Sequence, residues 1–108
     1  MTDSEFETLA DAALTAAERA LEASGVDADL QWKGSGVLEV EFGDGSKLIL
    51  NRHTAAREVW IAARSGGFHL RHDGNAWRDT RDRTELFPLL SRLVSAQSGV
   101  PVILAPAA

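Results

Sequence analysis

The sequence predicts an α+β fold: a two-layer sandwich in which two helices, one near each end of the chain, pack on one face of a single antiparallel sheet. Two observations carry this prediction. An apolar pattern with the helical period occupies the first 24 residues and returns after residue 84. Between these segments, short alternating apolar runs are separated by turn residues, which is typical of strands joined by hairpins. The length of 108 residues suits one core, so a single domain over residues 1–108 is expected.

The first helix is predicted over residues 4–24. Ser4, with Glu7 three residues later, matches a capping box, and Gly25 is a typical helix stop. At about 100° per residue, the apolar side chains of this segment share one arc of the helix. We expect that arc to contact the sheet, through Phe6, Leu9, Ala10, Ala13, Leu14, Ala17, Ala20 and Leu21.

The strands are predicted from alternation. The clearest covers residues 37–42, where Leu38, Val40 and Phe42 alternate with two glutamates, and a turn around Asp44 leads into a strand at 47–51. A weaker pattern predicts a strand at 29–33. The others are predicted at 58–63, at 68–72 after a break at Gly66-Gly67, and around Trp77.

The second helix is predicted to begin at an N-cap Thr84, after a solvated connection at residues 78–83, and to end at Gly99. Its inner face is expected to hold Leu86, Leu90, Leu93, Val94 and Gln97, and the apolar run 101–104 is expected to lie against the core. Because both helices cover the same face of the sheet, the opposite face is left without a helical cover.

The composition excludes several classes of function. The chain has no cysteine, which excludes disulfides, thiol catalysis and zinc–thiolate sites. Its net charge of -5 argues against a nucleic-acid partner, which would require phosphate neutralisation. No apolar run approaches the roughly 18 residues of a membrane span, and the N-terminus lacks the features of a signal peptide. We therefore expect a soluble cytoplasmic protein without a membrane partner.

Acidic side chains are concentrated at the start of the chain. The first 30 residues carry eight acids and one base, whereas the remaining 78 carry eight acids and ten bases. In the first helix, the acids at spacings of 4, 7 and 4 point within about 60° of one another. No base at i±4 relieves this stripe, and two further acids just past the helix are positioned to extend it. The stripe on the helix consists of Glu7, Asp11, Glu18 and Glu22. The two acids that extend it are Asp27 and Asp29.

Two interpretations of the stripe remain open from the pattern alone. Carboxylates that do not encircle an ion suit weakly held hard cations, and they also suit a basic partner protein. The alternative is a solvated acidic face of a surface helix, with Glu7 explained by its capping box.

Trp60 is the second candidate. If Val59 and Ile61 face the helices, Trp60 points to the uncovered face of the sheet, where an exposed indole is a natural binding anchor. The opposite register would bury Trp60 in the core. The histidines form no converging set, because His69 and His72 fall on opposite faces of one strand and His53 stands alone after another.

The chain resembles the bacterial frataxins, the CyaY family, over essentially its whole length. The similarity rests on the order and spacing of several short segments rather than on one motif. They are Ser4-Glu5-Phe6 with Leu9-Ala10-Asp11, Gly36-Val37-Leu38, Phe42, Gly45-Ser46-Lys47, Asn51-Arg52, Val59-Trp60-Ile61-Ala62, Gly66-Gly67-Phe68-His69 and Trp77.

The resemblance implies a non-enzymatic regulator of iron–sulfur cluster assembly. It implies an acidic ridge on the first helix and first strand that binds iron weakly at Asp11, Glu18, Glu22, Asp27 and Asp29, with Glu7 completing the helix stripe. It also implies docking on a cysteine desulfurase and its scaffold partner through Glu18, Glu22, Asn51, Trp60 and His69.

The ridge is thinner than in strongly acidic members of that family, because Arg19 and Ala23 stand where others place acids. Gln31 and Lys33 also interrupt the acidic run on the first strand. Fewer iron ions or weaker docking are therefore expected. The rival hypotheses are a ferroxidase that stores iron in oligomers, which would need paired, inward-facing carboxylates, and an interaction domain without a metal role.

Overall fold

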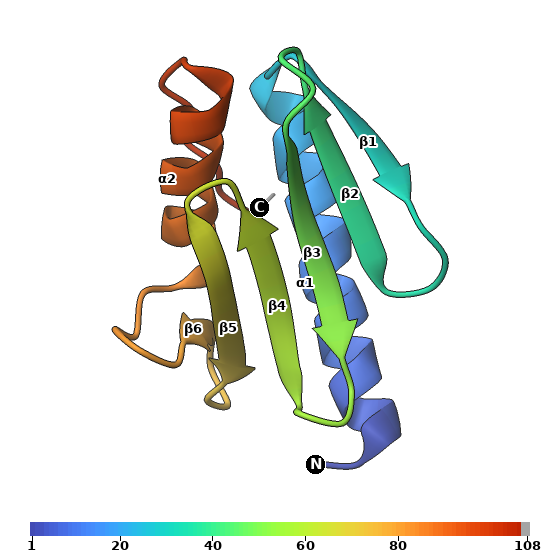
Figure 1. Ribbon diagram of the computed structural model, residues 1–108. Helices are drawn as coiled ribbons and strands as arrows, with labels where there is room; N and C mark the ends of the chain where they lie inside the picture. Colours follow the sequence, from blue (N-terminus) through green and yellow to red (C-terminus); the bar gives the residue numbers. More distant parts are fainter. Residues whose placement is uncertain (107–108) are drawn as a thin grey trace.

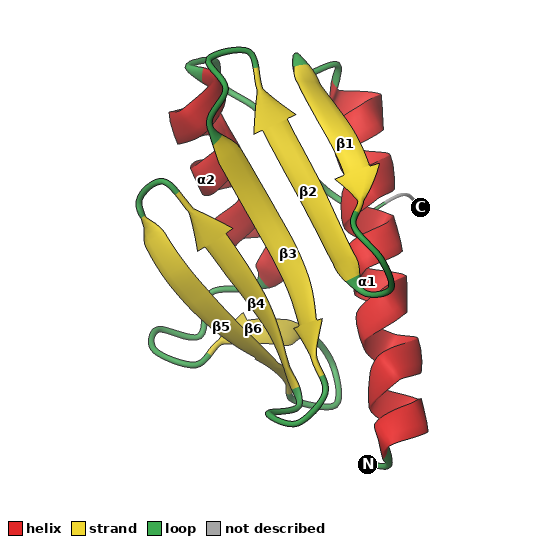
Figure 2. Cartoon of the chain, turned by 45° about the vertical axis from the view of Figure 1, so that its right-hand side comes forward, coloured by secondary structure: helices red, strands yellow, loops and turns green. Residues whose placement is uncertain are grey.

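The computed structural model describes residues 1–106 as two layers (Figure 1). One layer is an antiparallel sheet with strand order β1-β2-β3-β4-β5-β6, and the other holds both helices against the same face (Figure 2). The predicted fold class is confirmed. Residues 107 and 108 of the predicted domain lie outside the described residues. The elements are α1 (Asp3–Ser24), β1 (Ala28–Trp32), β2 (Val37–Phe42), β3 (Lys47–His53), β4 (Glu58–Ala63), β5 (Gly66–His72), β6 (Trp77–Asp79) and α2 (Leu86–Ser98).

The N-cap of the first helix lies two residues before the predicted capping residue. Thr2, not Ser4, is the N-cap: its Oγ1 accepts from the Glu5 N–H at 3.1 Å, and Glu5 Oε1 accepts from the Thr2 N–H at 2.9 Å. The prediction of Ser4 was therefore wrong. The sequence offers two matches to the capping pattern, Thr2–Glu5 and Ser4–Glu7, and the structure uses the first. The earlier cap adds a residue to the start of the helix, and Phe6 in its first turns is buried in the core.

Two strands are longer than predicted. β3 continues through Arg52 to His53, because both residues pair with the start of β4. The predicted break at Gly66-Gly67 is wrong, since these glycines pair with Ala63 and Ala62 and begin β5. Gly66 has a φ of 144°, a conformation that a residue with a side chain rarely adopts, which permits this tight return of the chain.

The segment before α2 also differs from the prediction. The N-cap position is Glu85, which makes no side-chain cap bond, and the carbonyl of Thr84 instead accepts the N–H of Asp79 at 2.8 Å. Asp79 lies in β6 and is only 2% exposed, so the predicted solvated connection at 78–83 begins inside the fold. Its carboxylate accepts the N–H of Arg81 at 2.9 Å, which satisfies the buried charge locally.

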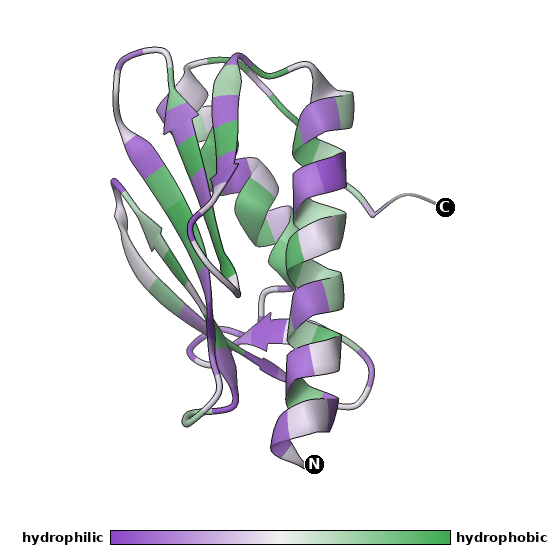
Figure 3. Ribbon diagram, turned by 90° about the vertical axis from the view of Figure 1, so that its right-hand side faces the viewer, coloured by the Kyte–Doolittle hydropathy of each residue, from purple (hydrophilic) through white to green (hydrophobic). Residues whose placement is uncertain are grey.

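The core lies between the sheet and the helices. The apolar arc of α1 is buried as predicted, except that Leu9 is half-buried, and Figure 3 shows its hydrophobic segments alternating with hydrophilic ones around the helix. The inner face of the sheet is formed by residues in strict alternation, which fixes the direction of every side chain between them. These inner residues include Leu38, Val40, Phe42, Leu48, Leu50, Val59, Ile61 and Leu70. The other face of the sheet, here called the open face, carries the intervening side chains.

The segment after α2 returns along that helix. Ser95 Oγ accepts the N–H of Val102 at 2.9 Å, and Ser91 Oγ accepts the N–H of Leu104 at 2.8 Å. Leu104 is 4% exposed, in line with the expected contact of this run with the core, whereas Ile103 is 91% exposed. Within residues 1–106, no helix combines the length and apolarity required to cross a membrane.

Candidate functional site: an acidic surface and an aromatic surface

The acidic stripe of α1 divides into two halves with different surroundings. In the first half, Arg52 Nη1 lies 2.6 Å from Asp11 Oδ1 and Arg52 Nη2 lies 3.8 Å from Glu7 Oε2. Thr54 Oγ1 also donates to Glu7 Oε2 at 3.1 Å. The expectation that no cation relieves the stripe is therefore wrong for Glu7 and Asp11, because the cation comes from the sheet rather than from the helix.

Arg52 reaches α1 because of its position in β3. Leu48 and Leu50 of that strand point inward, so Arg52, two residues further on, points to the same side. Gly36, at a φ of 78°, makes room for it, since a Cβ there would lie 2.9 Å from Arg52 Nε. The predicted strand ended at residue 51, so the contact was missed. With β3 extended to His53, the strand period of two predicts that Arg52 points toward α1.

The second half of the stripe carries no ion pair. Glu18 Oε2 accepts a hydrogen bond from Trp32 Nε1 at 2.8 Å, which orients the carboxylate without neutralising its charge. Among residues 1–106, no Lys, Arg or His nitrogen lies within 4 Å of the carboxylate oxygens of Glu18, Glu22, Asp27 or Asp29. The open part of the predicted ridge is therefore its C-terminal half together with the residues that follow.

These acids adjoin one another at the β1 edge of the sheet. Glu22 and Asp29 line one surface depression of about 350 Å³, and Asp27, Asp29 and Glu41 line another of about 250 Å³. Asp29 pairs directly with Glu41 across β1 and β2, an arrangement of like charges that destabilises a sheet. We call Glu18, Glu22, Asp27, Asp29 and Glu41 the acidic surface. Glu41 was missed by sequence reasoning, although the alternation of β2 already placed it on the open face.

The donor atoms of the acidic surface are all carboxylate oxygens. Such a set suits a hard cation that keeps most of its water. In residues 1–106, no group of three or more His, Asp or Glu side chains lies close enough together to hold a metal ion. A cation at this surface would therefore contact at most two of these carboxylates at once, and water would supply its other ligands.

Trp60 takes the predicted register. Val59 and Ile61 are buried against the helices, and Trp60 is half-buried on the open face. It pairs with Asn51 on β3 and with His69 on β5, so these three predicted partner-binding residues lie side by side. The alternative, in which Trp60 belongs to the core, is excluded.

The indole of Trp60 lies between two imidazoles. His53 stacks on one side at a ring distance of 3.8 Å and an interplanar angle of 13°, and His69 on the other at 4.7 Å and 14°. We call His53, Trp60 and His69, with Asn51, the aromatic surface. The prediction that His53 stands alone was wrong, because it depended on ending β3 two residues too early. His72 contacts Trp77 on the opposite side of the sheet, as expected.

Glu58 lies beside this stack and was not predicted as a site residue. Its Oε1 accepts from Trp60 Nε1 at 2.7 Å and its Oε2 accepts from Arg71 Nε at 2.8 Å, while the residue is 8% exposed. Burial raises the pKa of the Glu58 carboxyl, but the bonds from Arg71 and Trp60 outweigh this and leave the pKa below its ordinary value. The group is therefore a buried carboxylate with both oxygens satisfied.

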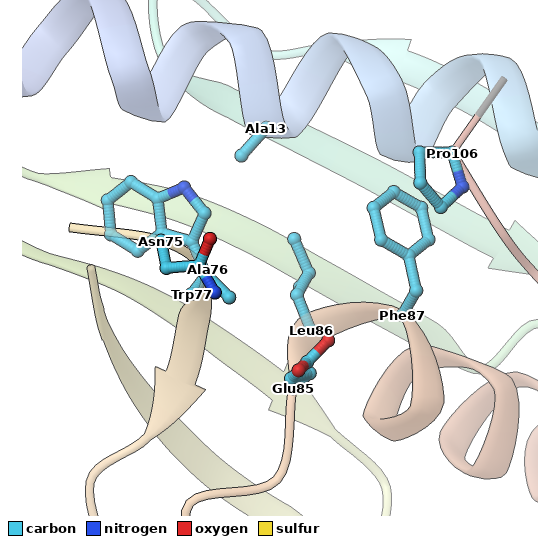
Figure 4. Close-up of a pocket in the computed structure, with 8 residues that line it drawn as sticks. All are labelled: Ala13, Asn75, Ala76, Trp77, Glu85, Leu86, Phe87 and Pro106. Carbon is cyan, nitrogen blue, oxygen red and sulfur yellow. The ribbon is translucent and has the colours of Figure 1, made fainter. Parts of the chain in front are cut away.

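A separate cavity of about 240 Å³ lies between α1, the β5–β6 turn and the start of α2 (Figure 4). Its lining is largely apolar, with Ala13, Leu86 and Phe87 directed toward it. None of the predicted site residues lines it, so it is distinct from both surfaces.

Comparison with known proteins agrees with the resemblance. The model of the frataxin-like domain matches residues 1–100. The iron–sulfur cluster assembly protein CyaY of Dechloromonas aromatica (strain RCB) is 54% identical over 104 residues, which is 96% of this chain and 99% of that protein. The protein of the same name from Ralstonia nicotianae is 51% identical over 107 residues, covering 96% and 95% of the two chains.

A solved structure, that of the frataxin from Psychromonas ingrahamii, superposes with a TM-score of 0.88 at 34% identity and covers 97% of this chain and 99% of its own. The family match extends over nearly the whole chain, and the arrangement of helices and sheet is shared. The chain therefore belongs to the frataxin-like family.

Proposed function

We propose that this protein acts in iron–sulfur cluster assembly as an iron-binding regulator that docks on a cysteine desulfurase and its scaffold partner. The general role is supported by relatives about half identical over nearly the full chain, which carry the name iron–sulfur cluster assembly protein. The cytoplasm is the compartment that we propose for this activity.

The observation that carries the proposal is the acidic surface. Five carboxylates gather at one end of the molecule without ion pairs among residues 1–106, and two of them face each other across adjacent strands. Asp29 and Glu41 repel each other, although Lys47 lies opposite Glu41 on β3, and a bound cation or a basic partner would relieve that repulsion. Iron held here would keep much of its water and exchange readily, because the ligands contact it from one side.

The same carboxylates suit a basic groove on the desulfurase. Exposed charges around an interface steer association and fix orientation. The aromatic surface, on the open face of the sheet, is the second and less polar contact area. Iron at the acidic surface would change the charge presented to the desulfurase, and through it the docking and the rate of cysteine turnover.

We propose that the protein is not itself an enzyme, because its free carboxylates are displayed on a surface rather than paired around an enclosed site. Addition of Fe²⁺ to the purified protein tests this point. Oxygen consumption no faster than that of Fe²⁺ in buffer is expected. Rapid consumption that saturates at two irons per chain would instead indicate a ferroxidase.

The regulatory proposal is tested by measuring desulfurase turnover in the presence of scaffold and this protein, with and without Fe²⁺. The double variant Glu18→Gln/Glu22→Gln is expected to abolish most of the iron-dependent change in turnover. Glu7→Gln/Asp11→Asn is the matched control, since it makes the same change of charge on the same helix at acids that already share the Arg52 guanidinium. Equal loss in both variants would contradict the proposal.

If neither variant alters turnover while Trp60→Ala does, an interaction domain without a metal role is favoured. A titration with a lanthanide, followed by amide chemical shifts, then separates the two cases: shifts near the acidic surface indicate a metal site, and their absence indicates none.

A further inference from the structure

Glu58 is unusual among the side chains of the open face. It is the first residue of β4 and lies on the side of the sheet that no helix covers, yet it is 8% exposed. A buried carboxylate stabilises a fold little by itself, because desolvation offsets much of the gain from its partners. The side chains that bind this carboxylate therefore indicate what role it has at this position.

Each oxygen of Glu58 has its own partner. Oε1 accepts the indole N–H of Trp60, and Oε2 accepts Nε–H of Arg71. His69 Nδ1 lies 3.6 Å from Oε1, so the carboxylate also borders one of the two imidazoles that sandwich the indole. Glu58 thus binds the indole N–H and lies beside one imidazole, so it borders two of the three rings of the aromatic surface.

The indole is constrained in three directions. His53 and His69 cover its two faces, and Glu58 holds its N–H edge. An exposed tryptophan on a flat strand has free rotation about two side-chain bonds, and a partner that binds it must suppress that freedom. In this protein the two imidazoles and Glu58 already restrict the rotation of the Trp60 side chain in the absence of a partner.

We propose that Glu58 is a positioning residue that locks the Trp60 indole between His53 and His69, so that the three rings form one preassembled recognition element. This proposal rests on the docking role proposed above for the aromatic surface. It adds His53 and Glu58 to that surface, the first as a ring of the element and the second as its support.

The stack also determines how a partner can approach. Both faces of Trp60 are occupied by imidazoles, so no ring or guanidinium of a partner can stack on the indole without displacing a histidine. Recognition therefore uses the edges of the rings and the outer face of His69, whose side chain is 53% exposed.

The test is a set of variants examined first without a partner. The indole N–H resonance of Trp60 is assigned by its loss in Trp60→Phe. In Glu58→Ala, we expect this resonance to shift and its hydrogen exchange to accelerate. In Glu58→Gln, which keeps an acceptor for the indole, we expect it to stay close to its wild-type position. Glu39→Gln is the matched control, because Glu39 lies on the same face with a side chain 12% exposed and is paired with Lys33 and Lys47.

The affinity for the scaffold-bound desulfurase is then measured. Freeing one ordered side chain should weaken binding about 2- to 10-fold in Glu58→Ala. Glu58→Gln should restore most of that loss, and Glu39→Gln should not reproduce it. In a Trp60→Phe background, which lacks the N–H, Glu58→Ala should have little further effect if Glu58 acts through the indole.

Two results would overturn the inference. One is a Glu58→Ala protein that is less stable but keeps the indole resonance and the affinity of the wild type. The other is full additivity of Glu58→Ala and Trp60→Phe. If Glu58→Ala does not fold, Arg71→Gln carries the indole measurement, because it removes the other partner that holds the Glu58 carboxylate. Faster hydrogen exchange of the indole N–H is expected, and an unchanged resonance and exchange rate would count against the proposal. By contrast, wild-type affinity in Trp60→Ala would refute the docking role of the aromatic surface, while the partner-free spectra still test Glu58.

Discussion

The two halves of the acidic stripe on α1 share a spacing and a helix face but differ in charge compensation. Glu7 and Asp11 face Arg52 of β3, whereas Glu18 and Glu22 face the end of β1, which offers Trp32 and further acids instead of a base. The period of a helix predicts which side chains lie in a row. The residues of the sheet opposite them decide whether the acids of that row are ion-paired within the fold or form a free anionic surface.

The largest expected effect concerns the free half. Charge reversal in Glu18→Lys/Glu22→Lys should weaken binding to the desulfurase about tenfold or more at about 0.15 M salt, because two attractive contacts with a basic groove become repulsive. Isothermal titration calorimetry over a range of salt concentrations measures the affinity and its salt dependence. Unchanged affinity at moderate salt would contradict the docking role of the acidic surface.

The next effect concerns the paired half. Arg52→Ala should lower the free energy of unfolding by about 1–2 kcal/mol, since two acids lose their shared, largely buried partner. It should also extend the anionic surface along α1, so that lanthanide-induced shifts reach Glu7 and Asp11. Denaturant unfolding and an NMR titration follow the two effects. The control is Arg64→Ala, which removes an exposed arginine paired with Asp44 at a distance from α1; if it has the same two effects, the account of Arg52 is wrong.

A smaller effect is expected at the contact between α1 and β1. Trp32→Phe keeps an aromatic ring but removes the Nε1–H that Glu18 accepts, which should lower stability by about 0.5–1 kcal/mol. The freed carboxylate should weaken cation binding only about twofold, because its charge remains. A loss of cation binding as large as that of Glu18→Gln would show that orientation, rather than charge, controls the site.

The smallest effect is the dependence of stability on acid. The hydroxyl and N–H of Ser46, together with Arg64, lower the pKa of Asp44 from 3.8 to about 2. A group with a lowered pKa in the folded state stabilises the fold above its unfolded pKa, and this contribution disappears as the pH falls from 3.8 toward 2. Asp44→Asn should flatten the loss of stability in this range. Thermal unfolding of the wild type and of Asp44→Asn, followed against pH, measures the difference, and the same loss in both proteins would contradict this prediction.

The sequence was sufficient for most of the fold. The strands at 37–42 and 58–63 were predicted with their final bounds, because a period of two with one buried face leaves little freedom of register. The same alternation left two registers open for Trp60, and the resemblance to the frataxins implied the one on the open face. The helix stripe was predicted because its period is local and does not depend on the rest of the chain.

What the sequence did not provide were contacts between distant segments. Arg52 lies 41 residues after Asp11, and its pairing depends on β3 continuing past residue 51. The stack of His53 on Trp60 was missed for the same reason, and Glu41 because its partner Asp29 belongs to a weakly patterned strand. The ends of a strand depend on the strands that pair with it, which the local sequence does not show. A predicted end that is one or two residues too early therefore omits side-chain contacts of the site, such as those of Arg52 and His53.

The central claim is that the free acids, not the whole stripe, form the cation-binding surface. A titration of ¹⁵N-labelled protein with a paramagnetic lanthanide tests it most directly, since the broadening of each amide reports its distance from the ion. The account predicts broadening centred on residues 18–29 and Glu41, with Glu7 and Asp11 little affected. Broadening of equal strength around Glu7 and Asp11, or none at any residue, would contradict it.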